Sequence, residues 1–122
     1  MAWNKHTAAV HARQNAGSSS QKRCGEFTRK AILAGGVDIG NAPNAKDYGN
    51  NLERSGFRIL GQGETLLEGD VVVIQPYVGG NPAGHMAIYD GNNWYSDFRQ
   101  RDMWGGPGYR SARPSYKIYR KN

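Results

Sequence analysis

One residue in this chain is a clear candidate nucleophile: Cys24, the single cysteine among 122 residues. A lone thiol cannot form an internal disulfide, and one sulfur is a poor start for a metal site. A polar run, residues 18–23, leads into Cys24, which begins a helical segment. A thiol at a helix start lies near unpaired backbone N–H groups and the positive end of the helix dipole, and Lys22, Arg23 and Arg29 add positive charge. These features favour the reactive thiolate.

His85 is the best candidate for a base that takes the proton of this thiol. It begins a predicted strand, residues 85–89, directly after Gly84, where the backbone can approach another element closely. The other two histidines, His6 and His11, are five positions apart and do not share the helical face that zinc ligands use. We treat them as surface residues, and the predicted chemistry needs no metal and no organic cofactor.

The identity of a third polar residue depends on the register of a hairpin. The segment 90–93 is a strong turn signal after the histidine strand. If its first three residues form the loop, His85 lies opposite Asp97, whose carboxylate would orient the imidazole. If the loop is one residue longer, Phe98 lies opposite His85 and Ser96 or Asp97 is offset.

Cysteine, histidine and a polar group have a defined chemical logic. A thiol with a pKa of about 8.5 is mostly protonated at neutral pH, and an imidazole can accept its proton. The thiolate attacks an amide carbonyl, backbone N–H groups hold the oxyanion, and the imidazolium returns the proton to the leaving amine before water hydrolyses the thioester. The alternative is structural: Cys24 is a small buried hydrophobe and His85 a hydrogen-bonded strand end, since spacing alone does not bring them together.

The pattern along the chain predicts an α+β fold, with N-terminal helices packed on a small antiparallel sheet. Helices are predicted over 3–16, 24–34 and 44–56, and strands over 57–60, 71–75, 85–89, 94–98 and 116–119. The continuous apolar run 71–75 indicates burial on both faces of the sheet. At this length, residues 1–122 are expected to form a single domain.

The overall charge is positive, with 16 Lys and Arg against 10 Asp and Glu, a formal net charge of +6. This charge favours polyanions without naming one, because the basic residues are scattered; a solvated basic surface is the simpler interpretation. No apolar stretch approaches the roughly 20 residues that span a bilayer. The N-terminus also lacks the apolar core of a secretory signal. We therefore expect no transmembrane segment and synthesis in the cytoplasm without a signal peptide.

Four parts of the chain resemble the NlpC/P60 and CHAP cysteine amidases, which are papain-like peptidoglycan hydrolases. They are residues 20–36, similar to the nucleophile helix; 67–74, similar to the Leu-x-Gly-Asp strand; 84–91, similar to the histidine strand and turn; and Asp97, at the third polar position. The resemblance implies a papain-like NlpC/P60-type fold, with Cys24 as nucleophile, His85 as base and then acid, and Asp97 as orienting residue. Many relatives carry histidine, asparagine or glutamate at that third position, so Asp97 matches by position only. Gln21 is the candidate for a side-chain oxyanion donor.

The compact length and the segments 45–49, 96–100 and 106–110 look more like small amidase effectors delivered by type VI secretion. This resemblance implies a peptidoglycan stem peptide as substrate, action in the periplasm of a target cell, and secretion machinery as a partner. It also implies a cognate immunity protein that plugs the cleft at Cys24. The missing signal peptide fits this route, and it fits a phage lysis endopeptidase equally well.

The sequence therefore predicts a cysteine amidase or endopeptidase acting on peptidoglycan, with no nucleic-acid partner. Its aromatic residues Trp94, Trp104 and Tyr109 are candidates for a substrate-binding wall, although core and loop packing also explains them. The alternative function is a basic module that binds nucleic acid or an anionic wall polymer without turnover. In that module Cys24 and His85 would be structural.

Overall fold

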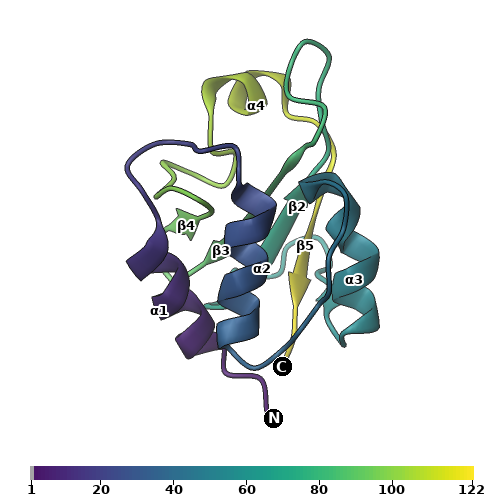
Figure 1. Ribbon diagram of the computed structural model, residues 1–122. Coiled ribbons are helices and arrows are strands. Elements are labelled where there is room, and N and C mark those ends of the chain that lie inside the picture. The colour runs from purple at the N-terminus through teal and green to yellow at the C-terminus, as the bar shows by residue number, and fades with distance from the viewer. Residues whose placement is uncertain (1) are drawn as a thin grey trace.

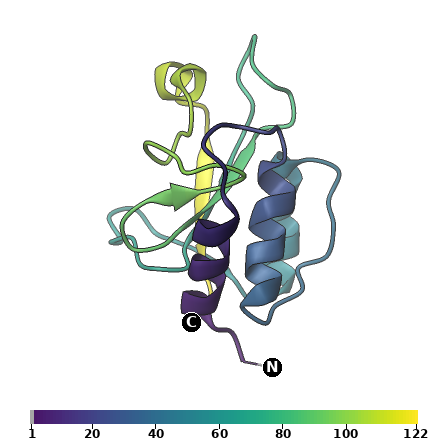
Figure 2. The same ribbon diagram turned by 60° about the vertical axis from the view of Figure 1, so that its left-hand side comes forward.

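A five-stranded antiparallel sheet is the centre of the computed structural model, which describes residues 2–122. In spatial order its strands are β1 (Arg58–Ile59), β5 (Tyr116–Arg120), β2 (Val71–Ile74), β3 (His85–Tyr89) and β4 (Trp94–Tyr95). Three helices pack on one face (Figures 1 and 2): α1 (Lys5–Asn15), α2 (Cys24–Ala34) and α3 (Tyr48–Arg54), the last preceded by the 3-10 turn η1 (Ala45–Asp47). The predicted α+β fold is confirmed. Within the described residues, no helix has both the length and the apolar character needed to cross a membrane.

Strand β2 is buried on both faces, as its apolar run predicts. Val71 and Val73 belong to the core cluster that the three helices cover. Val72 and Ile74 belong to a second cluster on the opposite face, against which Trp104 and other residues of the segment after β4 pack. The sheet therefore excludes water from both of its faces at β2, and this gives the neighbouring β3 and its histidine a rigid support.

The hairpin between β3 and β4 has the longer of the two loops considered. Tyr89 pairs with Trp94, so all four residues from Asp90 form the loop, and the register that places His85 opposite Asp97 is wrong. The carboxylate of Asp90 explains the loop, because its Oδ1 accepts hydrogen bonds from the backbone N–H groups of both residues 92 and 93, at 2.8 and 2.7 Å.

The chain leaves the sheet earlier than predicted after this hairpin. Strand β4 ends at Tyr95, and the following residues turn back on themselves through a 3.0 Å bond from the Ser96 N–H to the Phe98 carbonyl. A short helix, α4 (Pro107–Ala112), then lies above the sheet in the view of Figure 1, in a segment for which the sequence predicts no helix. Proline at the first helical position explains its start.

Candidate active site

A cleft of about 670 Å³ contains both residues of the predicted pair, Cys24 and His85. The start of α2, the η1 turn, the loop between β2 and β3, and the segment leading into α4 form its walls. Trp104 and Tyr109 also line it, whereas Trp94 does not. Trp94 instead lies in the second core cluster, stacked 5.0 Å from Tyr89, because its strand faces the interior on that side.

Cys24 is the first residue of α2, as the sequence predicts. The helix is fixed on the sheet one turn later, where the buried Thr28 hydroxyl donates a 3.4 Å hydrogen bond to the Met86 carbonyl of β3. Arg23, the N-cap, makes no side-chain capping bond, so its side chain does not occupy the first amides of the helix. The Cys24 thiol and the free backbone N–H groups therefore lie together at the N-terminus of α2.

Asp97 holds the loop in front of Cys24 and is not hydrogen-bonded to His85. Its Oδ2 accepts hydrogen bonds from the backbone N–H groups of Gln21 at 2.6 Å and Arg23 at 2.9 Å, and its Oδ1 accepts one from the Ser96 hydroxyl at 3.1 Å. The expected orienting role for Asp97 rested on the shorter hairpin loop and on its position in the family resemblance. With the longer loop, the carboxylate turns instead toward the backbone that precedes α2.

Gln100 is the side chain bonded to His85, and the sequence interpretation missed it. The Gln100 amide nitrogen donates to the carbonyls of Asp102 and Met103, at 2.9 and 3.2 Å, so its Oε1 remains to accept from His85 Nε2 at 2.6 Å. The proton of the neutral ring is therefore on Nε2, and Nδ1 is the free acceptor. No motif marks Gln100, since the chain reaches it by looping out after β4.

Two glycines allow the backbone to approach the histidine closely. A Cβ at Gly84, which has φ +74°, would lie 2.5 Å from the Ile74 carbonyl oxygen, as the predicted close approach requires. A Cβ at Gly105 would lie 2.8 Å from His85 Nε2 and 3.2 Å from the Gln100 amide. Gly84 thus brings the start of β3 close to the end of β2, and Gly105 brings backbone without a side chain against the imidazole and its amide partner.

Burial shifts the pKa values of Cys24 and His85 so that the uncharged form of each is favoured. It raises the pKa of the Cys24 thiol, and hydrogen bonding from the Met86 backbone acts in the opposite direction without overcoming it. Burial also lowers the pKa of the His85 imidazole, against the hydrogen bond of Gln100. Burial therefore opposes the thiolate that the helix start and nearby cations favour. Both directions favour the neutral forms, thiol and imidazole.

Two other predicted site residues, Gln21 and Tyr109, lie in different surroundings. The Gln21 amide nitrogen donates to the Asp97 carbonyl oxygen at 3.1 Å, so this side chain stabilises the loop and does not line the cleft. The Tyr109 ring lies 5.7 Å from the His85 ring, and its buried hydroxyl has no hydrogen-bond partner among the described residues. Burial, with the nearby Cys24, raises the pKa of Tyr109 to about 12, so this hydroxyl keeps its proton.

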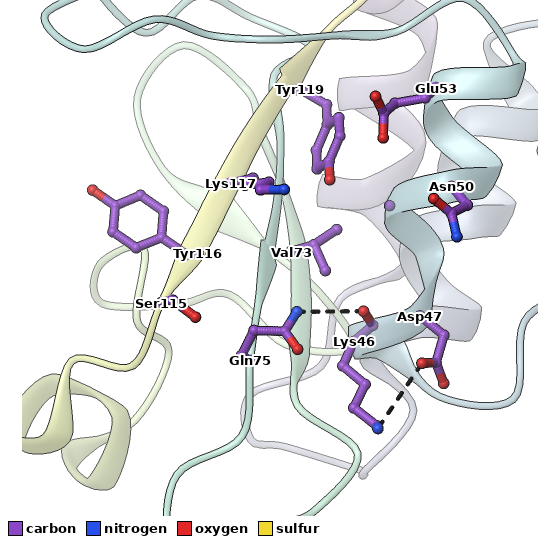
Figure 3. A pocket seen from close by; sticks show the side chains of 11 residues that line it. Lys46, Asp47, Asn50, Glu53, Val73, Gln75, Ser115, Tyr116, Lys117 and Tyr119 are labelled. Carbon is purple, nitrogen blue, oxygen red and sulfur yellow. Dashed lines mark hydrogen bonds and ion pairs between the residues drawn. The ribbon is translucent and has the colours of Figure 1, made fainter.

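A second hollow, of about 430 Å³, lies between α3 and β5 (Figure 3). Lys46, Asp47, Glu53 and Lys117 bring charges of both signs to its wall. Lys46 and Asp47 pair across 4.0 Å. The hollow includes neither the cysteine nor a histidine, so the nucleophilic chemistry belongs to the first cleft.

Fold and cleft together define a papain-like α+β protein, with a cysteine at a helix start and a histidine at a strand start. Two solved structures of the type VI effector–immunity complex Tae3–Tai3 from Ralstonia pickettii are similar to this chain. The native complex matches with 45% identity and a TM-score of 0.93, over 98% of this chain and 100% of that chain. The selenomethionine complex matches with 47% identity and a TM-score of 0.88, over 93% and 99%. The chain belongs to the Tae3 family of type VI effectors.

A more distant structure, Ly7917, shares the fold alone. Its identity is 18% and its TM-score 0.54, over 94% of this chain and 62% of that chain. No protein-family model and no curated protein matches the chain. Membership of the NlpC/P60 or CHAP families therefore stays a prediction.

Replacing Asp97 with asparagine tests whether this carboxylate holds the loop before α2. Two charge-assisted bonds to backbone N–H groups are weakened, so we expect the free energy of unfolding to fall by about 2 kcal/mol in urea titrations. Asp38→Asn is the matched control, because the exposed Asp38 carboxylate accepts a single backbone N–H, from Gly40. Its loss should stay within about 0.5 kcal/mol. Equal losses in the two variants would contradict this role for Asp97.

Proposed function

We propose that this chain is an antibacterial peptidoglycan amidase that cleaves an amide bond of the stem peptide or cross-link by a cysteine–histidine mechanism. The observation that carries the proposal is the single cleft that Cys24, at the start of α2, lines together with His85, whose tautomer Gln100 fixes. Membership of the Tae3 family supports the effector assignment, since the relatives are type VI effectors in complex with immunity proteins. The alternative, a non-catalytic basic module, gives no reason for a histidine with a defined free nitrogen in the same cleft as the only cysteine.

The reaction begins with the pair in its neutral form. His85 Nδ1 accepts the thiol proton as the Cys24 sulfur attacks the carbonyl carbon, and the C–N bond breaks as the imidazolium protonates the leaving amine. Backbone N–H groups at the start of α2 stabilise the oxyanion. Water, deprotonated by His85, then hydrolyses the thioester and releases a carboxylate and the free thiol. Gln100 is a positioning residue, which orients the ring and favours its protonated form in the transition state.

The biological setting follows from the same proposal. Residues 1–122 form one cysteine amidase domain related to the NlpC/P60 and CHAP enzymes. The producing cell exports it by type VI secretion, and it acts in the periplasm of the target cell. A cognate immunity protein that covers the cleft protects the producing cell and its kin.

Replacing Cys24 with alanine should abolish activity on purified sacculi while the protein remains folded. Release of new amine ends should fall at least about a thousandfold, because the nucleophile and its base act as a unit. His85→Ala should match this loss, and His6→Ala, which removes an exposed histidine on α1, should retain activity. Unchanged amine release by folded Cys24→Ala would exclude the thiol mechanism. Steeply salt-dependent binding to a polyanion without cleavage would support the non-catalytic module instead.

Replacing Gln100 with glutamate should move the pH profile of the reaction. A carboxylate beside Nε2 favours the imidazolium, so the pKa of His85 rises from its lowered value. Because catalysis needs the neutral ring in the free enzyme, the acidic limb of kcat/KM shifts to higher pH. Gln75→Glu is the matched control, a similar change in the wall of the second hollow, and should leave the profile unchanged. An unshifted limb in Gln100→Glu would separate Gln100 from His85 function.

A further inference from the structure

The charges that line the active-site cleft do not cancel. Lys22, Arg23 and Glu26 are the charged side chains in its wall. The Arg23 guanidinium forms a fork on the Glu26 carboxylate, at 3.0 and 2.5 Å, and Lys30 bonds to the same carboxylate at 2.8 Å. Lys22 is left, because within residues 2–122 its ammonium group has no hydrogen bond or ion pair. An unpaired cation thus stands two residues before the nucleophile.

Lys22 has a backbone conformation that lysine rarely adopts. Its φ is +59°, in the left-handed region that favours glycine. The turn around Asp97 requires this conformation, since one carboxylate oxygen binds the N–H groups of both neighbours, Gln21 and Arg23. Glycine would satisfy the turn without strain. Local structure therefore does not explain a lysine here, whereas a ligand for its charge does.

We propose that Lys22 binds a carboxylate of the substrate peptide beside the amide bond that is cleaved, an inference that rests on the proposed function. Peptidoglycan stem peptides carry free carboxylates close to their amide bonds, for example at the glutamate residue. Arg23 and Glu26 pair with one another, so Lys22 supplies the charge that an anionic peptide meets on entering the cleft. Lys22 determines specificity and takes no part in bond breaking.

Two synthetic cross-linked pairs of stem peptides that differ only at the glutamate carboxylates, free in one and converted to the carboxamide in the other, test this inference. We expect the unsubstituted protein to prefer the free acid about fivefold in kcat/KM, a preference that weakens as salt is added. In Lys22→Gln the ratio of the two kcat/KM values should fall to about 1. Lys117→Gln, the same change in the wall of the second hollow, should keep the preference.

Lys22→Gly separates binding from backbone strain. It should lose the preference as Lys22→Gln does, yet melt about 3 °C higher, because glycine relieves the left-handed strain. A lower melting temperature would overturn the argument that local structure does not require the lysine. Equal cleavage of both peptides by the unsubstituted protein, or a preference retained in Lys22→Gln, overturns this inference and leaves the proposed function standing. Cleavage of neither peptide by the unsubstituted protein overturns both.

Discussion

The buried carboxylate of Asp97 is the constraint on which the site depends. It is 0% exposed, and among residues 2–122 its hydrogen-bond donors are two backbone N–H groups and the Ser96 hydroxyl, with no cationic side chain. A buried carboxylate is tolerated only where such donors replace the water it has lost. The loop before α2 and the segment after β4 therefore fix each other. The thiol of Cys24 takes its position from a group that is not bonded to it.

Burial raises the pKa of the Cys24 thiol, whereas backbone N–H groups at the helix start lower it, and the effect of burial is the larger. Burial also lowers the pKa of His85, so it favours the uncharged form of both residues. A half-buried neutral thiol also resists oxidation, which matters for a protein that is proposed to work outside the cytoplasm. Oxidation of cysteine follows thiolate character and exposure, and a half-buried neutral thiol has little of either.

Features set by the local sequence were predictable, whereas contacts that depend on the three-dimensional path of the chain were not. Apolar spacing gave α2 with Cys24 at its start, and the run before Gln75 gave a strand buried on both faces. The hairpin register failed because it depends on how Asp90 binds its own loop. Gln100 was not predicted for a related reason. Its amide contacts His85 because β4 ends early and the chain folds back. The similarity to Tae3 supports the fold over 98% of the chain, while the proposed roles of these side chains rest on their geometry.

Gly105 sets a limit on how this site can vary. It offers no functional group, yet its missing side chain is what leaves room for the ring of His85 and the amide of Gln100. With φ at +80° and two reactive-site groups within 3.2 Å of any added carbon, both the backbone and the space reject a substitution. Gly106, the next residue, has open space around it. Among random variants of this loop, substitutions should therefore be tolerated far better at Gly106 than at Gly105, although Gly105 contributes no side chain to the chemistry.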